Sequence, residues 1–113
     1  MAVCVNTGGG GLDQVIDGAE VVRAKGPNFV SPFAIPSILI DTAPGQIAIE
    51  YGLRGPNLGI VGACASGNYG IGEAYHAILR GDADLVITGG VEDAIHPFTL
   101  AGFERARAMS GHN

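Results

Sequence analysis

The hexapeptide 62–67, Gly-Ala-Cys-Ala-Ser-Gly, contains a cysteine between a short apolar run and a helical segment of small residues. This context predicts that the Cys64 thiol lies at a helix N-terminus. Amide N–H groups of a first helical turn point at a side chain placed there, and the helix dipole favours a negative charge. The thiolate is the nucleophilic form of cysteine, so Cys64 is the candidate nucleophile. The spacing alone supports equally a core cysteine that acts only as a small hydrophobe.

Composition limits the functions that the chain can have. The 113 residues carry a net charge of −5 with no cluster of Lys and Arg, which argues against nucleic acid and anionic membranes as partners. Hydrophobic residues make up 47% and charged residues only 15%, so we expect much of the surface to be covered by something else. Cys4 and Cys64 form no CxxC pair, which favours a reducing cytoplasm. We expect no metal, because His, Cys, Asp and Glu show no ligand spacing.

Apolar runs alternate with segments of helical periodicity along the chain. We expect strands over 2–6, 57–61 and 85–88, and helices over 12–24, 37–50 (capped by Ser37) and 65–80. Residues 29–36 are predicted as an ordered loop, and 92–109 as a loop with one helical turn. Alternating strands and helices, with apolar strands, indicate an α/β layered fold whose sheet is covered on both faces.

Several short segments occur in an order and spacing that resemble a known family. They are Ser31-Pro32-Phe33, residues 51–57 (Tyr-Gly-Leu-Arg-Gly-Pro-Asn), 63–67 around Cys64, 81–84 (Gly-Asp-Ala-Asp), 89–92 (Gly-Gly-Val-Glu), and 101–103 with 108–110. The set resembles the N-terminal half of β-ketoacyl-acyl-carrier-protein synthases, the condensing enzymes of fatty-acid and polyketide assembly. It is closer to the discrete elongating synthases than to modular polyketide synthases, which usually read Asp-Thr-Ala-Cys-Ser-Ser at the nucleophile. Residues 1–113 are therefore interpreted as such an N-terminal domain, truncated at both ends.

The resemblance implies a thiolase-like layered fold, partial here, with the active site between two related halves. Cys64 would take an acyl group from a thioester on acyl-carrier protein, with its own N–H as one oxyanion donor. The acyl group would then condense with the carbanion left by decarboxylating malonyl-acyl-carrier protein. The implied partners are acyl-carrier protein, which carries substrates on phosphopantetheine, and a second subunit in a homodimer. No other cofactor is implied, and fatty-acid biosynthesis is preferred to a polyketide pathway.

Other site residues follow from the resemblance by matched position. Gly9 falls where elongating synthases often carry a gating aliphatic residue at the acyl pocket. Ala34 replaces an aromatic residue that would reach that pocket from the partner subunit, while Thr99 and Phe103 match pocket-lining positions. The small residues at 9 and 34 suggest a roomier acyl channel. The alternative is that Gly9 is only a turn residue and Ala34 ordinary packing.

The chain departs from the family pattern in its histidines. The family's two catalytic histidines, supporting lysine and second oxyanion donor belong to the C-terminal half, and none of those motifs is present here. His76, His96 and His112 occupy none of the catalytic positions, so we expect surface or loop roles for them. This chain alone is therefore expected to catalyse no condensation.

Three other interpretations compete with a synthase. A cysteine hydrolase would need Gly-x-Cys-x-Gly, but here two residues separate Cys64 from Gly67. A nucleotide-binding module is suggested by the glycine turn at 7–11, which lacks GxGxxG because Asp13 replaces the third glycine. A silent partner similar to a chain-length factor would usually lack the cysteine. Preferential alkylation of Cys64 over Cys4 would separate a reactive nucleophile from the silent partner.

Overall fold

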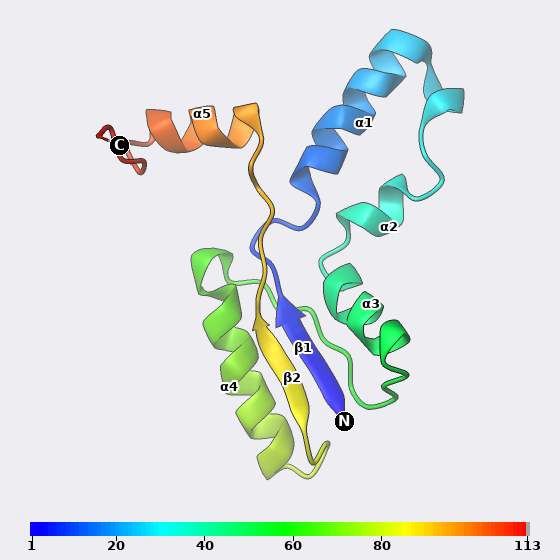
Figure 1. Cartoon of the computed structure of the whole chain (residues 1–113), viewed down its shortest axis with the longest axis vertical. Coiled ribbons are helices and arrows are strands. Elements are labelled where there is room, and N and C mark those ends of the chain that lie inside the picture. Colours follow the sequence, from blue (N-terminus) through cyan, green and yellow to red (C-terminus); the bar gives the residue numbers. More distant parts are fainter. Residues whose placement is uncertain (113) are drawn as a thin grey trace.

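The computed structural model describes residues 1–112, which are built around a parallel pair of strands. Strand β1 (Ala2–Asn6) pairs with β2 (Val86–Gly90), in a register that places Ala2 opposite Val86 and Asn6 opposite Gly90 (Figure 1). All five residues of β1 are buried. Because successive side chains of a strand point to opposite faces, burial of every residue means that both faces of β1 are covered. The α/β prediction, with strands over 2–6 and 85–88, is confirmed, although β2 begins at Val86 and runs on to Gly90.

Two helices provide that cover, one on each side of the strands. Helix α4 (Ser66–Leu79) packs along both strands, and α3 (Thr42–Glu50) packs against β1 from the other side (Figure 1). The small residues of α4 let it approach closely: a Cβ added to Gly70 would lie 2.2 Å from Nδ2 of Asn6. A Cβ added to Gly90 would likewise lie 2.9 Å from Cα of Gly67. Gly67 and Gly70, which weaken α4 by propensity, therefore make its close packing possible, whereas a Cβ added to Gly72 would have nothing within 4 Å.

The remaining helices extend from this centre. They are α1 (Leu12–Lys25), the 3-10 turn η1 (Pro27–Phe29), α2 (Ala34–Ile38), the 3-10 turn η2 (Ala63–Ala65) and α5 (Pro97–Arg105). Helix α1 matches the predicted helix over 12–24.

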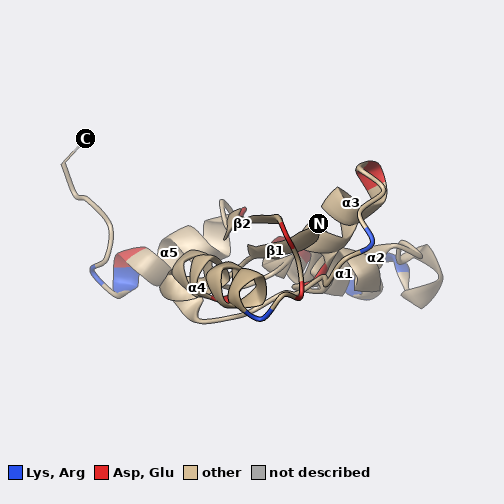
Figure 2. Cartoon of the chain, turned by 90° about the horizontal axis from the view of Figure 1, so that it is seen from below, with Lys and Arg blue, Asp and Glu red and all other residues tan. Residues whose placement is uncertain are grey.

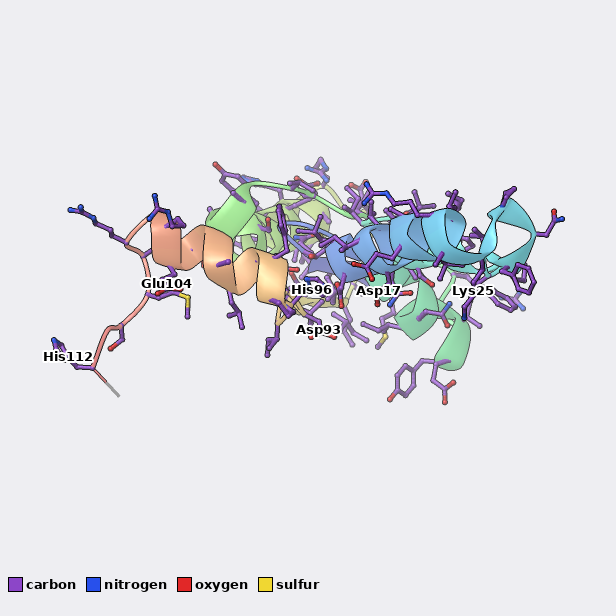
Figure 3. The ribbon with its side chains drawn as sticks, turned by 90° about the horizontal axis from the view of Figure 1, so that it is seen from above. Asp17, Lys25, Asp93, His96, Glu104 and His112 are labelled. Atoms are coloured by element: carbon purple, nitrogen blue, oxygen red, sulfur yellow. The ribbon has the colours of Figure 1, made fainter. Side chains whose placement is uncertain are left out.

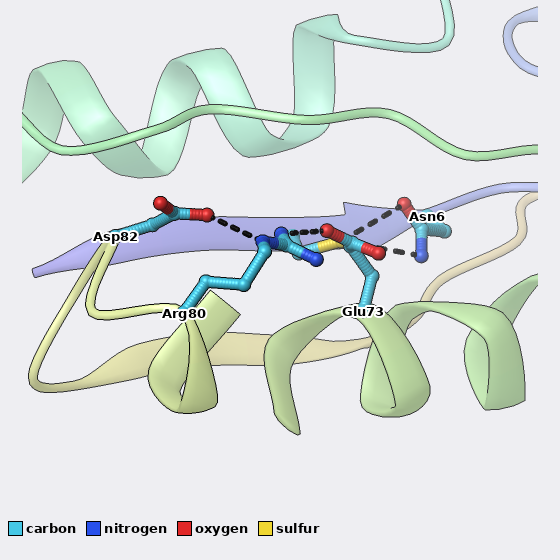
Figure 4. Close-up of polar contacts among 5 residues, drawn as sticks. Asn6, Glu73, Arg80 and Asp82 are labelled. Atoms are coloured by element: carbon cyan, nitrogen blue, oxygen red, sulfur yellow. Dashed lines mark hydrogen bonds and ion pairs between the residues drawn. The ribbon is translucent and has the colours of Figure 1, made fainter. Parts of the chain in front are cut away.

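At the far end of α4, Arg80 forms ion pairs with Glu73 and, at 2.8 Å from Nε to Oδ2, with Asp82 (Figure 4). The hydrogen bonds that Arg80 donates to these two carboxylates raise the pKa of Arg80, and the bond to Glu73 has the larger effect.

The prediction of one continuous helix over 37–50 is wrong, although residues 42–50 within that range are helical. The chain forms α2 and α3 instead, separated at Leu39, whose ψ of 139° is extended. Ser37 does not cap a helix, since its Oγ donates to the carbonyl oxygen of Phe33 at 2.8 Å. Pro44 lies in the first turn of α3, where a missing N–H removes no intrahelical hydrogen bond. The proline therefore marks the start of a helix rather than a kink within one.

The predicted strand over 57–61 is also wrong. This segment runs beside β1, and Leu58 N donates to Val3 O at 3.0 Å, but strand pairing is limited to a single bridge between Val3 and Asn57. The next amide in reach, Ile60 N, donates instead to the side-chain Oδ1 of Asn6 at 2.8 Å. A side chain thus replaces the main-chain acceptor that would have continued the ladder.

Two regions predicted as loops contain more helix than expected. Helix α2 begins at Ala34, inside the predicted loop 29–36, and α5 extends over nine residues rather than one turn. The N-terminus of α5 is capped by His96, whose Nδ1 accepts from Phe98 N at 3.1 Å, while Thr99 Oγ1 accepts from His96 N at 3.2 Å. Histidine is not among the usual capping residues, so the local signal for this helix start is Pro97 at its first position.

The described residues form a thin slab of 49 × 42 × 19 Å (Figure 2). Its buried apolar core is small and lies at β1 and the inner face of α4: Ala2, Val3, Cys4, Val5, Ala74 and Ala77. At one edge α5 approaches α1, where Nε2 of His96 lies 3.7 Å from Oδ1 of Asp17 (Figure 3). Within residues 1–112, no helix has the length and apolar character needed to cross a bilayer.

Candidate active site

A cavity of about 750 Å³ lies where the carboxyl ends of β1 and β2 meet the start of α4. Its lining is mostly apolar and comes from the glycine loop after β1, the turn η2, the first turns of α4 and helix α5. Four residues singled out from the sequence line it together: Gly9, Cys64, Thr99 and Phe103. Segments far apart in the sequence thus meet around one thiol.

Cys64 lies in the turn η2, directly ahead of α4, and its side chain is exposed. The turn is closed by Ala65 N, which donates to Gly62 O at 2.9 Å, and by Ser66 N, which donates to Ala63 O. Neither of these two hydrogen bonds uses the N–H of Cys64. The thiol therefore stands at the N-terminal end of the helix and on a cavity wall, where amide dipoles favour a developing negative charge.

The turn holds an unusual backbone conformation just before the cysteine. Ala63 has φ of 49°, in the left-handed region that residues with a Cβ seldom adopt. Ser66 stabilises it with two hydrogen bonds: its Oγ donates to Ala63 O at 2.7 Å and accepts from Gly62 N at 2.9 Å. Such a strained residue persists only where its surroundings fix it. The sequence therefore encodes both the sharp turn and the hydroxyl that holds it.

Asn6 ties this turn to the sheet. Its side chain is fully buried at the end of β1; Nδ2 donates to Ser66 O at 3.1 Å, and Oδ1 accepts from Ile60 N at 2.8 Å. One amide thus links β1, the start of α4 and the 57–61 segment. Sequence reasoning missed this role. The available signal was a polar residue at the end of a buried strand, immediately before a glycine-rich turn.

The second cysteine has a different environment. Cys4 is buried in β1, and its Sγ lies 3.8 Å from both Oδ1 and Nδ2 of Asn6. Burial raises the pKa of the Cys4 thiol, and the nearby Glu73 carboxylate raises it further, while the contact with Asn6 lowers it. Both cysteines are free thiols, but only Cys64 is exposed.

Glu92, two residues beyond β2, contacts the glycine loop that follows β1. Its Oε1 accepts from Thr7 Oγ1 at 3.0 Å, and its Oε2 accepts from Gly8 N at 2.9 Å and Gly9 N at 3.2 Å. The carboxylate also lines the cavity that contains Cys64. Sequence reasoning used Glu92 only as part of a motif and assigned it no contact.

The other residues predicted from the sequence lie in varied places. Thr99 is buried and its Oγ1 donates to His96 O at 2.8 Å, whereas Phe103 is half-exposed at the cavity. Ala34 is the first residue of α2 and does not line this cavity. His76 and His112 are exposed, and His96 caps α5, so none of the histidines lines it either.

The described part of the chain contains no group of three or more His, Cys, Asp or Glu residues placed to hold a metal ion. An exposed thiol at a helix start, facing a mostly apolar cavity, can attack an electrophilic carbonyl whose substituent is apolar.

Comparison with known proteins identifies related sequences. The family model described as "Beta-ketoacyl synthase, N-terminal domain" matches residues 1–113. Curated relatives named 3-oxoacyl-(acyl-carrier-protein) synthase 2 include that of Rhizobium meliloti, 44% identical over 96% of this chain and 26% of the relative. That of Vibrio cholerae is 42% identical over 100% and 27%, and that of Staphylococcus aureus 43% over 97% and 27%. The chain thus spans about a quarter of the length of these relatives.

Solved structures give the same result for the fold. The ishigamide ketosynthase/chain length factor matches with a TM-score of 0.79 and 27% identity, over 98% of this chain and 31% of that one. A type II polyketide-synthase ketosynthase, bound to the hexaketide and in complex with its acyl-carrier protein, matches with a TM-score of 0.78 and 25% identity, over 98% and 28%. The expected thiolase-like layered fold is confirmed.

Proposed function

The chain belongs to the β-ketoacyl synthase family, and from that premise we propose that it provides the acyl-accepting cysteine of a 3-oxoacyl-acyl-carrier-protein synthase. The reaction is the decarboxylative Claisen condensation of a Cys64-bound acyl group with malonyl-acyl-carrier protein in fatty-acid biosynthesis. One observation carries the proposal: the Cys64 thiol is exposed at the start of α4 and lines a mostly apolar cavity of about 750 Å³.

Acyl transfer needs a thiolate and a donor for the oxyanion. The Cys64 sulfur forms a bond to the carbonyl carbon of the acyl thioester, and the bond from that carbon to the phosphopantetheine sulfur breaks. The departing thiolate takes up the proton that Cys64 has released, so the thiol of the carrier arm leaves. The Cys64 N–H, which lies outside the bonds that close the turn, is the oxyanion donor that this chain offers.

The cavity is suited to an acyl chain because its lining is mostly apolar. Gly9, Thr99 and Phe103 form part of its wall, and we assign them to acyl binding. Ala34 lies elsewhere in this subunit, and its proposed role is as a small residue facing the acyl pocket of a partner subunit. Residues as small as Gly9 and Ala34 favour a roomy acyl channel.

The rest of the proposal concerns groups outside this chain. Decarboxylation and proton handling belong to histidines and a lysine of the family's C-terminal half, for which the sequence here has no counterpart. We propose a cytoplasmic homodimer that uses acyl-carrier protein as partner and no further cofactor. Support for the carrier comes from the similar ketosynthase solved in complex with its acyl-carrier protein.

A polyketide ketosynthase is the second candidate, because the two solved structures described above are of polyketide type or include a chain length factor. Their identity of 25–27% is lower than the 42–44% shared with the 3-oxoacyl synthases, which favours the fatty-acid function. A silent chain-length-factor-like partner is disfavoured by the presence of an exposed Cys64.

Condensation by a synthase that carries this chain tests the proposed function. With acyl- and malonyl-acyl-carrier protein, we expect ketoacyl product from the wild type and from Cys4→Ala, and none from Cys64→Ala. The 113-residue chain by itself should give no product, because it lacks the decarboxylating groups. Full activity of Cys64→Ala would refute Cys64 as the acyl-accepting residue. Product from the 113-residue chain alone would refute the expectation that this chain cannot catalyse condensation by itself.

A further inference from the structure

We propose that Glu92 is a positioning residue, which holds the loop Thr7–Gly10 in place and thereby sets the shape of the cavity around Cys64. The holding role stands on the hydrogen bonds alone. Its consequence for acyl transfer rests on the proposed function.

The carboxylate of Glu92 binds three groups of one loop. It accepts from the Thr7 hydroxyl and from the Gly8 and Gly9 amides, at 3.0, 2.9 and 3.2 Å. The Thr7 Oγ1 in turn accepts from Gly10 N at 3.1 Å. Three consecutive glycine amides are therefore fixed, directly or through one hydroxyl, by a single side chain. Hydrogen bonds to an ionised carboxylate are stronger than those between neutral groups.

The loop needs such a support because it has no side chains of its own after Thr7. Residues 8–11 are all glycine, the residue type with the largest conformational freedom. Glu92 itself starts from a fixed point, since the preceding Val91 N donates to Asn6 O at 2.8 Å and so continues the pairing of β2 with β1. The carboxylate thus ties the ends of both strands together beyond the sheet.

The supported loop touches the turn that carries the thiol. Gly8 packs so closely on Ala63 that a Cβ added to Gly8 would lie 3.0 Å from Ala63 O. Ala63 is the strained residue immediately before Cys64, and both line the cavity together with Gly8, Gly9 and Glu92. A shift of the loop would therefore change both the wall of the cavity and the support of the Cys64 turn.

Three variants of the synthase that carries this chain separate the contact from the charge. Glu92→Ala removes all three acceptor contacts, while Glu92→Gln keeps one oxygen for the Gly8 and Gly9 amides and an NH₂ that can donate to Thr7 Oγ1. Asp93→Ala is the matched control, because Asp93 is exposed and makes none of these contacts. Glu92→Asp, which is shorter by one methylene, replaces Glu92→Ala if that variant does not fold.

The first readout is amide hydrogen exchange at Gly8 and Gly9. We expect Glu92→Ala to speed exchange there by about tenfold or more, as for the loss of a charged hydrogen bond, with α4 unchanged. Glu92→Gln should restore most of the protection, and Asp93→Ala should match the wild type. Unchanged exchange in Glu92→Ala, or faster exchange spread equally over α4, would overturn the holding role.

The second readout is the rate of Cys64 acylation by acyl thioesters of increasing length. We expect Glu92→Ala to lower the rate for long chains by about tenfold while acetyl transfer changes little, because only a long chain needs the cavity wall. Equal losses for all lengths, or none, would overturn the cavity-shaping role. Absence of acylation in the wild type would instead refute the proposed function, and the exchange result would still decide the holding role.

Discussion

Cys4 and Cys64 have the same functional group but opposite surroundings. Cys4 is 2% exposed within β1, and burial, its largest influence, raises the pKa of its thiol. Cys64 is exposed on the cavity wall at the start of α4. The assignment of chemistry to Cys64 rather than Cys4 therefore follows from access as well as from position, since only an accessible sulfur can reach a thioester.

The raised pKa of Cys4 predicts a loss of stability in alkaline solution. An acid whose pKa is higher in the folded state holds its proton longer there, so its contribution is intact below the unfolded thiol pKa of about 8.5. That contribution is lost as the pH rises through the higher folded pKa. The midpoint of urea unfolding should thus fall between neutral pH and about pH 10 more in the wild type than in Cys4→Ala. An equal fall in both would contradict the burial argument.

Gly9 tests the width of the acyl cavity. A Cβ at this position would meet only Glu92 Oε1, at 4.0 Å, so a side chain can be added without strain. In a synthase that carries this chain, Gly9→Ile should lower the rate of Cys64 acylation by long acyl chains by about tenfold, because the isoleucine takes up space that their methylene groups would fill. The rate of acylation by short acyl chains should not change. Gly102→Ala on α5, where an added Cβ has nothing within 4 Å, is the control. A wild type with no preference beyond medium length would refute the roomy channel.

At the scale of elements, the site depends on how the start of α4 is attached to the sheet. Asn6 provides this attachment through Ser66 O and Ile60 N, and Ser66 then holds the strained turn before Cys64. The attachment is entirely polar and fully buried at Asn6. Without the Asn6 side chain, Ser66 O and Ile60 N would lose their hydrogen-bond partner in the interior, and unpaired buried polar groups lower the free energy of unfolding.

Asn6→Ala should therefore destabilise the fold by about 2–4 kcal/mol, because it leaves two main-chain groups unpaired. Asn68→Ala is the matched control, since Asn68 is an exposed asparagine in the first turn of α4, the turn that Asn6 contacts, and should change stability by about 0.5 kcal/mol at most. Urea unfolding measures both. A loss for Asn6→Ala no larger than that of the control would contradict the role given to Asn6.

The elements that were predicted well from the sequence are those determined by local pattern. Apolar runs and helical periodicity located β1, β2, α1 and α4 to within a few residues. The predicted helix over 37–50 failed for a local reason, because the chain is extended at Leu39 and α3 begins only at Thr42. A non-local contact decided the other failure, since the Asn6 side chain ends the pairing of the 57–61 segment. Asn6 and Glu92 were missed at the site for the same reason, since their partners lie 54 to 85 residues away.

At the scale of the whole molecule, the described chain is flat and its apolar surface is extensive. Its radius of gyration is 16.8 Å, against roughly 13 Å for a compact domain of this length. Large side chains such as Ile49, Tyr75 and Leu79 are 75%, 61% and 63% exposed. Composition had indicated the apolar surface, because a chain with so few charged residues cannot cover its surface with charged groups. The position of Cys64 also followed from local sequence, whereas the cavity required the full arrangement.

Transfer of an acyl group to Cys64 is the central claim, and one measurement tests it directly. The synthase that carries this chain is incubated with acyl-acyl-carrier protein alone, without malonyl substrate, and the site of acylation is mapped by mass spectrometry. We predict one added acyl group, on the peptide that contains Cys64, and none on Cys4. Acylation confined to another residue, or an unmodified Cys64 after prolonged exposure to the acyl donor, would contradict the account.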